Sequence, residues 1–229
     1  MTLATCLKSA AAALTLMLAA GPVLAAETPT PEQMAALGAR IERLEDANAI
    51  EIVQRSYGYF VDKGLWSDVT DLFSENAHLE IGGRGVQIGK PHILDYMRGA
   101  FAHDGITEGQ LINHTQYQPI VHVAADGRTA RLRSRAFVMS TGGWGLPIYE
   151  NQYVKENGVW KISVLHAPFT MYTNWTGWAK FATPNTRPDS FGAPPDLPPT
   201  VVYLTYPSPY TTPFHYPNPV TGKPWVEGK

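Results

Sequence analysis

Apolar residues in the first third of the chain recur at the spacing of an amphipathic helix. Thr30 and Pro31 mark a helix start, because threonine caps a helix and proline suits its first turn. Four apolar residues follow at intervals of three and four: Met34, Leu37, Ile41 and Leu44. A second set continues the period: Ile50, Val53, Tyr57, Phe60 and Val61. The pattern predicts two consecutive helices, the second of which ends at Lys63 and Gly64.

Shorter elements follow this helical region. Residues 67–73 are predicted to form a short helix, and residues 77–81 and 85–88 a hairpin around Gly82 and Gly83. A further helix starts at Lys90, again with a proline in its first turn.

After residue 110 the apolar period changes from helical to alternating. Four long strands are predicted, over residues 110–123, 129–140, 146–155 and 159–172. Glycine-containing turns separate them, among which Asn157-Gly158 is a strong hairpin signal. Helices followed by a run of strands indicate an α+β fold with an antiparallel sheet.

Both ends of the chain differ from this central part, which spans residues 30–180. At the start, Lys8 precedes an apolar run that ends at Gly21 and Pro22. This predicts a cleaved secretory signal over residues 1–25, hence an exported, periplasmic protein; an uncleaved amphipathic start is the alternative. The signal contains Cys6, the single cysteine. No other apolar run reaches the length of a membrane-spanning helix, so no membrane association is expected after cleavage.

At the other end, residues 183–229 hold 12 of the 19 prolines, interleaved with seven large aromatic residues. Proline at this density excludes helices and central strands. A solvated linker would rarely carry so many aromatics. The segment is therefore predicted to be an extended arm that lies on the domain or on a neighbouring subunit, and a partly disordered tail is the alternative.

Composition and motifs exclude several classes of function. The 229 residues carry 18 Lys and Arg against 20 Asp and Glu, a balance without the basic surface that nucleic acids require. The sequence contains no glycine-rich phosphate loop and no HExxH motif, and its seven histidines are scattered. We therefore expect no metal, no cofactor and no nucleic-acid partner.

Several short motifs resemble a known family. Residues 43–46, Ser56-Tyr57, Asp62 and Trp66, followed by the segment 157–162, are similar to the SnoaL-like branch of the NTF2-like superfamily, to which scytalone dehydratase belongs. The resemblance implies a cone in which a curved antiparallel sheet wraps around N-terminal helices and leaves a deep apolar pocket. It also implies a homo-oligomer, dimeric or trimeric, because proteins of this fold commonly associate through the outer sheet face.

The leader and the tail rich in proline and tyrosine resemble a subgroup from bacteria that degrade aromatic compounds, which includes cofactorless diarylpropane lyase. This resemblance implies a lyase that dehydrates or deformylates a small aromatic alcohol, such as a lignin-derived diarylpropane. Two other functions stay open. One is a non-catalytic protein that binds a small apolar ligand. The other is a ketosteroid isomerase-type proton shuttle, for which the chain shows neither the isolated base nor an oxyanion hole.

The resemblance also implies a catalytic pair, Asp62 at the end of the second helix and His114 in the first long strand. A carboxylate that accepts from one imidazole nitrogen makes the other a proton acceptor near neutral pH. The alternative is a helix-end aspartate and a partly buried histidine. Tyr59 is three residues from Asp62, so it is expected on the same helix face as a third catalytic group.

Substrate contacts are expected from Tyr57, Trp66, Tyr149 and Asn151, although Tyr57 also fits a core aromatic at helical spacing. Alternation along residues 146–155 places Tyr149 and Asn151 on one face, and a bulge would instead bring Glu150 into the pocket.

The chain also departs from scytalone dehydratase-like proteins. By counting along the chain, Met139, Val61 and Ile81 take the places of a second pocket histidine and two pocket tyrosines. His166 and Tyr172 are predicted at the pocket mouth.

Overall fold

The computed structural model describes residues 28–101, 104–177 and 192–226. The predicted leader lies outside these residues, as do residues 183–191 and 227–229 of the predicted arm. The elements are α1 (Pro31–Asp62), α2 (Trp66–Asp71), β1 (Phe73–Ile81), β2 (Val86–Ile88), α3 (Lys90–Phe101), β3 (Ile112–Val123), β4 (Thr129–Ser140), β5 (Gly143–Glu156), β6 (Val159–Ala167) and β7 (Phe169–Thr173). Within the described ranges, no helix is long and apolar enough to cross a membrane.

The two helices predicted at the start form one helix, α1, of 32 residues. Its N-terminus is a capping box, in which the Thr30 hydroxyl accepts from the backbone of Gln33 and the Gln33 amide oxygen accepts from the backbone of Thr30. The prediction of two helices is wrong because no glycine or proline separates Leu44 from Ile50, so nothing interrupts the backbone hydrogen bonds.

The helix ends where its backbone meets a loop from another part of the chain. Gly64 has a φ of 64°, and a Cβ atom there would lie 2.5 Å from the carbonyl oxygen of Gly105. The amide of Gly105 donates to the carbonyl of Gly64 at 2.9 Å. Glycine is therefore required at position 64 both by conformation and by space, and this contact holds the C-terminal end of α1 in place.

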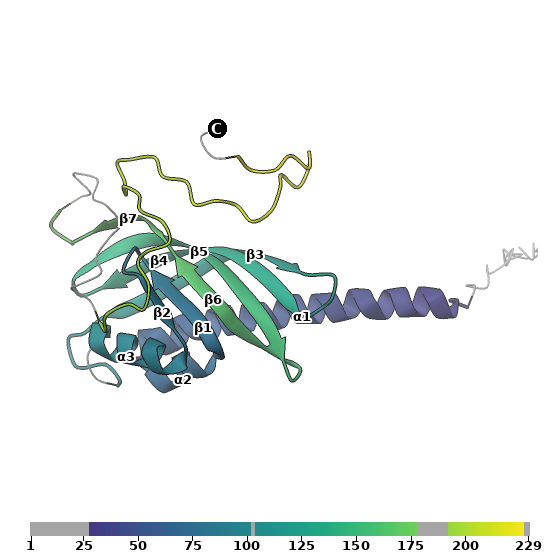
Figure 1. The fold of residues 1–229 in the computed structure, drawn as a ribbon, viewed down its shortest axis with the longest axis horizontal. Helices are drawn as coiled ribbons and strands as arrows, with labels where there is room; N and C mark the ends of the chain where they lie inside the picture. Colours follow the sequence, from purple (N-terminus) through teal and green to yellow (C-terminus); the bar gives the residue numbers. More distant parts are fainter. Residues whose placement is uncertain (1–27, 102–103, 178–191, 227–229) are drawn as a thin grey trace, which may run out of the picture.

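The strands form one curved sheet in the order β2-β1-β6-β5-β4-β3, with the helices on one side (Figure 1). The pairs are antiparallel except for β1 and β6, which run parallel. The α+β class and the curved sheet around N-terminal helices are thus confirmed. The parallel pair is an addition that the alternating pattern did not predict.

The last predicted strand, residues 159–172, is divided in the structure into β6 and β7. Pro168 separates the two segments, since proline cannot donate a hydrogen bond to a neighbouring strand. Both pair with β5, but at different places: β6 pairs with residues 152–156, and β7 with residues 144–147. The prediction of one continuous strand is therefore wrong.

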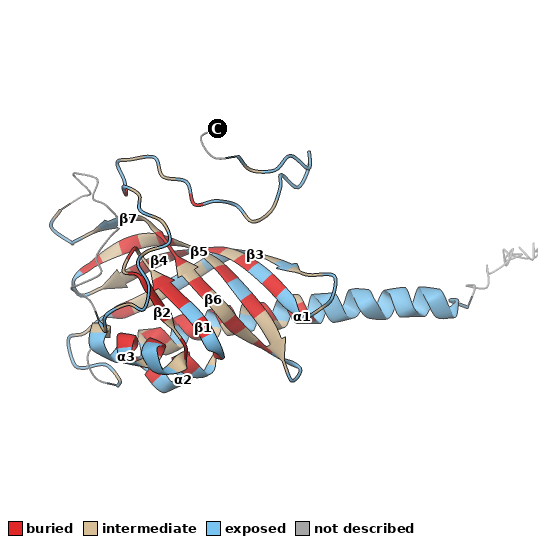
Figure 2. Ribbon diagram, in the orientation of Figure 1, coloured by how far each residue is buried: buried red, intermediate tan, exposed pale blue. Residues whose placement is uncertain are grey.

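The hydrophobic core lies between the helices and the concave face of the sheet. The C-terminal half of α1 contributes Ile50, Tyr57 and Val61, each at most 1% exposed. By contrast, residues 31–45 of α1 are all exposed, and this half of the helix projects beyond the sheet (Figures 1 and 2). Only the second half of α1 is thus packed against the domain.

Residues 192–226 lie along the outer face of the sheet, opposite the helices. Leu197 forms a bridge with Val86 of β2, and Thr200 donates two hydrogen bonds to Glu80 of β1 at 2.8 and 2.6 Å. Further along, the His215 ring lies 2.7 Å from the Glu150 carboxylate of β5. The arm therefore follows the sheet from one edge towards the other, and these contacts lie within a single chain.

Candidate active site

Asp62 and His114, which are 52 residues apart in sequence, meet where the end of α1 crosses β3. Nδ1 of His114 donates a hydrogen bond to Oδ1 of Asp62 at 3.0 Å. The two side chains are 14% and 13% exposed, so the pair is largely withdrawn from water. A carboxylate that holds Nδ1–H in this way fixes the imidazole tautomer with Nε2 as the proton acceptor.

Close packing of α1 on β3 produces this contact. A Cβ atom on Gly58 would lie 3.2 Å from the carbonyl oxygen of His114, so the absent side chain lets the helix approach the strand. Gly58 is one helical turn before Asp62, which places the carboxylate at the level of the imidazole.

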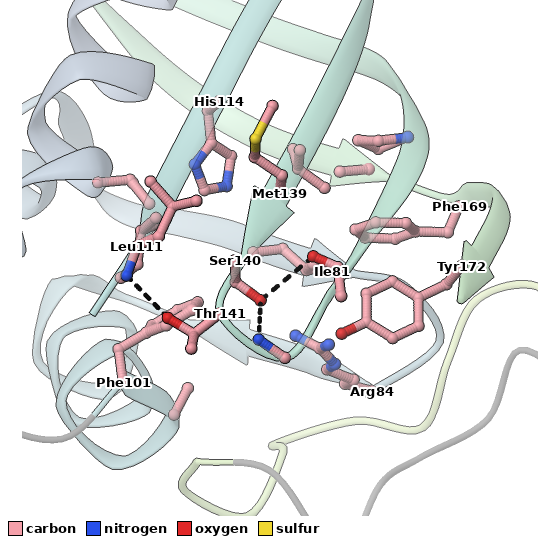
Figure 3. A pocket seen from close by; sticks show the side chains of 18 of the residues that line it. Ile81, Arg84, Phe101, Leu111, His114, Met139, Ser140, Thr141, Phe169 and Tyr172 are labelled. Carbon is pink, nitrogen blue, oxygen red and sulfur yellow. Dashed lines mark hydrogen bonds between the residues drawn. The ribbon is translucent and has the colours of Figure 1, made fainter. Parts of the chain in front are cut away.

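His114 forms part of the wall of a cavity of about 550 Å3 (Figure 3). Apolar side chains dominate the wall, among them Val61, Ile81, Phe101, Leu111, Ile112, Val138, Met139 and Phe169. Asp62 is not among the lining residues, so it acts on the cavity only through His114. A volume of this size suits a small organic molecule.

Two phenols, those of Tyr57 and Tyr149, line the same cavity with their rings edge to face, 6.1 Å apart. Burial raises the pKa of Tyr149, and the nearby charge of Asp62 raises it further. Burial likewise raises the pKa of Tyr57, with smaller contributions from Tyr149 and Tyr96. Both hydroxyls therefore stay protonated at neutral pH and can donate hydrogen bonds to an oxygen atom in the cavity.

The cavity also has polar groups that the sequence patterns did not indicate. Arg84 lines it from the turn after β1 and donates to the hydroxyl of Tyr96 at 3.1 Å. Ser140 and Thr141 line it at the end of β4, where the Ser140 hydroxyl accepts from the amide of Gly142 (Figure 3). The only signal for Arg84 was its place in a glycine-rich turn, which is a weak one.

Tyr59 does not lie in the cavity, so its predicted position beside Asp62 is wrong. Its side chain is 73% exposed. Residues three apart on a helix differ by about 60° in direction. Asp62 points towards β3, whereas this rotation turns Tyr59 out to solvent.

Trp66 is buried but is separated from the cavity by another ring. It stacks on Phe101 at 5.1 Å, and Phe101 lines the wall. The predicted direct contact of Trp66 with substrate is therefore wrong, and the indole instead supports the wall from behind.

Asn151 shares an inward face with Tyr149, as alternation predicted, but it does not line the cavity. Its amide nitrogen donates to Oε1 of Gln54 at 2.7 Å, and its oxygen accepts from the backbone of His166 at 3.1 Å. Gln54 also accepts from Tyr153 and donates to Gln116. The predicted contact of Asn151 with substrate is wrong, because this buried network uses both ends of its amide.

Glu150, the alternative to Asn151, points to the outer face, where it contacts Arg133 and His215. His166 is also outside the cavity and lies 3.8 Å from Glu80, while Tyr172 lines the mouth as predicted. Among the described residues, no group of three or more His, Cys, Asp or Glu side chains could hold a metal ion.

Comparisons with known proteins agree with this architecture. A family model described as a SnoaL-like domain matches residues 42–166. A candidate scytalone dehydratase from Novosphingobium aromaticivorans DSM 12444 is 18% identical, with a TM-score of 0.52 over 69% of this chain and 97% of the other. An NTF2-like protein with a cystatin-like fold, from Novosphingobium aromaticivorans, is 19% identical, with a TM-score of 0.53 over 61% and 92%.

A third solved structure is hexachlorocyclohexane dehydrochlorinase from Novosphingobium barchaimii LL02. It is 18% identical, with a TM-score of 0.51 over 61% of this chain and 96% of the other. The search of curated proteins found no match. At these identities the solved structures show the fold, whereas the family model covers more than half of the chain. The chain therefore belongs to the SnoaL-like domain family, within the NTF2-like fold.

Proposed function

We propose that this protein is a cofactor-independent lyase that eliminates a small group from an aromatic alcohol. The observation that carries the proposal is the position of His114. Its ring lines an apolar cavity of about 550 Å3, while its Nδ1 is bound at 3.0 Å by a carboxylate behind the wall. This leaves Nε2 as the basic atom available to a molecule in the cavity.

In the proposed reaction, His114 removes a proton from the substrate at Nε2 and becomes an imidazolium. Asp62 stabilises this cation through the hydrogen bond to Nδ1. The low polarity of the surrounding wall strengthens that interaction relative to water. A departing oxygen needs a proton or a hydrogen-bond donor, and Tyr57 and Tyr149 supply protonated hydroxyls in the same cavity.

The lining supports an aromatic substrate. Phe101, Phe169 and Tyr172 present ring surfaces, and rings pack against one another with favourable edge or offset geometry. The similar structures support an elimination, since one is named as a dehydrochlorinase and another as a candidate dehydratase. Their sequence identity is too low to transfer a substrate, so the aromatic alcohol is inferred from the cavity and from the subgroup resemblance.

The finer proposal is a phenolic 1,2-diarylpropane-1,3-diol. Loss of the benzylic hydroxyl as water would give a quinone methide. Proton removal from the hydroxymethyl group by Nε2 of His114 would then break the adjacent carbon–carbon bond and release formaldehyde. The bond electrons return to the ring and restore the phenol, so the products are a stilbene, water and formaldehyde. No oxidant or reductant is consumed.

The test is turnover of phenolic diarylpropanes and simpler phenolic alcohols by His114→Ala. We expect kcat to fall about 10²–10⁴-fold, the usual contribution of a general base. The matched control is His78→Ala, because His78 is exposed on β1 and does not line the cavity. Unchanged turnover in folded His114→Ala protein would overturn the assignment.

The alternative function is a protein that holds an apolar ligand without reaction, and the mainly apolar wall would suit it equally. Calorimetric titration separates the two functions. Binding of the same aromatic alcohols with no product from wild-type protein after prolonged incubation would favour the binding protein. Formaldehyde or dehydrated product would favour the lyase.

A further inference from the structure

One face of α1 carries a stripe of exposed apolar side chains along most of the helix. Six large apolar residues of this helix are between 48% and 73% exposed: Met34, Leu37, Ile41, Leu44, Ile52 and Tyr59. At 100° per residue they fall within one narrow sector, together with Asn48 and Arg55. The buried residues of α1, such as Ile50 and Tyr57, occupy the opposite sector. The stripe therefore faces away from the protein's own core.

The projecting half of α1 has no packing partner among the described residues. All side chains from residue 31 to residue 45 are exposed (Figure 2). A helix of about 12–15 residues is only marginally stable in water without tertiary contacts. Its stability therefore requires a surface that covers Met34, Leu37, Ile41 and Leu44.

The outer face of the sheet is already in use in this chain. Thr200 covers Glu80, and Phe214 stacks on Arg133 with 3.7 Å between the guanidinium carbon and the ring centre. A partner that binds this face would have to displace the arm. The helix stripe, in contrast, is open along its whole length.

We propose that the stripe of α1 pairs with the same stripe of a second copy of this chain. Two copies together present on the order of 1,000 Å2 of apolar surface, close to the lower end of specific interfaces. A membrane surface is a poorer occupant, because residues 31–45 carry three glutamates against two arginines and so lack the basic excess that anionic lipids attract.

The polar members of the stripe indicate an antiparallel pair. In a parallel pair, Arg55 would lie against Arg55 of the second copy, a like-charge contact. In an antiparallel pair centred between residues 46 and 47, Met34 meets Tyr59, Ile41 meets Ile52, and Leu44 meets Asn48. Arg55 then lies opposite Leu37, along which its aliphatic stem can pack.

This arrangement predicts which cysteines form disulfides between copies. In a Cys6→Ser background of the full chain, we would mix Met34→Cys protein with Tyr59→Cys protein under mild oxidation. We expect a disulfide-linked dimer from the mixture and little from either variant alone. The matched control replaces Met34→Cys by Ala39→Cys, on the opposite side of the projecting half, and this mixture should give at least tenfold less linked dimer.

A second measurement tests the interface without cysteines. Ile41→Asp places a charge in the centre of the stripe but touches no core residue, so the domain should fold and its melting profile serve as the check. We expect light scattering to show a mass reduced by half relative to wild type. A wild-type monomer, an unchanged mass in Ile41→Asp, or efficient linkage of Met34→Cys to itself would each overturn the antiparallel pair.

Discussion

Gly58 of α1 lies directly against the backbone of His114 on β3. A Cβ atom on Gly58 would be 3.2 Å from the carbonyl oxygen of His114 and 2.8 Å from Nε2 of Gln116. The glutamine side chain can move, but the strand backbone cannot move without disturbing its pairing with β4. The missing side chain therefore sets the distance between the helix that carries Asp62 and the strand that carries the histidine.

Gly58→Ala should lower activity more than its size suggests. The methyl group would push α1 away from β3 and lengthen the 3.0 Å contact between Asp62 and His114. We expect kcat to fall at least about tenfold and the free energy of unfolding by about 1–3 kcal/mol. The control is Gly38→Ala in the same helix, where a Cβ atom would meet nothing within 4 Å. That variant should gain about 0.5–1 kcal/mol, and equal effects in the two variants would contradict this account.

Asp62→Asn tests the carboxylate separately from the imidazole. The neutral amide can no longer stabilise an imidazolium and can hold the ring in the wrong tautomer. Because Asp62 does not line the cavity, we expect kcat to fall about 10²-fold while KM changes less than about threefold. A rise in KM at constant kcat, measured by steady-state kinetics, would instead place Asp62 in substrate binding.

The predicted pair Asp62 and His114 could be found from sequence because each occupies a recognisable position, a helix end and a strand, in a family pattern. Tyr59 failed because helical spacing gives a relative direction but not the direction of the core. Asn151 failed for a different reason. Alternation correctly placed it on the inner face, but only the structure shows that Gln54 of α1 meets it there.

Pairing of distant strands was the other part that local patterns could not supply. The alternation in β1 and β6 is the same whether they run parallel or antiparallel, since side chains alternate in both. Their parallel pairing follows from the path of the chain through α3 and three other strands. Pro168 was visible in the sequence, and a stricter use of its missing donor would have predicted the break between β6 and β7.

Asn151→Ala should affect stability and leave the chemistry largely intact. The substitution removes a donor to Gln54 and an acceptor for the backbone of His166, both in a buried region. We expect a loss of about 1–3 kcal/mol in the free energy of unfolding, measured by urea denaturation, because buried partners are left unpaired. The kcat of the folded variant should stay within about threefold of wild type. A loss of 10²-fold or more would return Asn151 to the active site.

Stability should fall with acidification below about pH 6.5, and His166 should account for part of the loss. Burial lowers the pKa of this imidazole, and the Glu80 and Glu150 carboxylates offset only part of that shift. The unfolded chain, with an ordinary histidine pKa near 6.5, therefore binds a proton before the folded chain does. The stabilisation is complete above about pH 6.5 and is lost as the pH falls towards the folded-state value.

The measurement is the melting temperature from pH 8 to pH 5 for wild type and for His166→Gln, which cannot titrate. We expect a smaller decrease in the variant. His78→Gln is the control, because His78 is exposed and should leave the wild-type profile unchanged. Identical profiles for wild type and His166→Gln would show that His166 does not contribute.

Deletion of residues 183–229 should destabilise the domain, because the arm neutralises and covers charges on the outer sheet face. Glu80 is only 5% exposed and accepts two hydrogen bonds from Thr200. Arg133 donates to the carbonyl of Pro213 at 3.0 Å and lies under Phe214. Hydrogen bonds to charged groups contribute about 1.5–3 kcal/mol each, whereas the arm costs entropy to order, less so at its prolines.

The net effect should be a melting temperature lower by at least about 4 °C, which corresponds to about 1–2 kcal/mol in a chain of this size. Phe214→Ala in the full chain is the finer test, since it removes the ring over Arg133 but keeps the backbone contacts. It should produce part of the decrease. If the arm instead served mainly to join subunits, truncation would lower the mass found by light scattering, whereas pairing through α1 predicts an unchanged mass. An unchanged melting temperature in both variants would show that the arm adds no stability, despite its contacts.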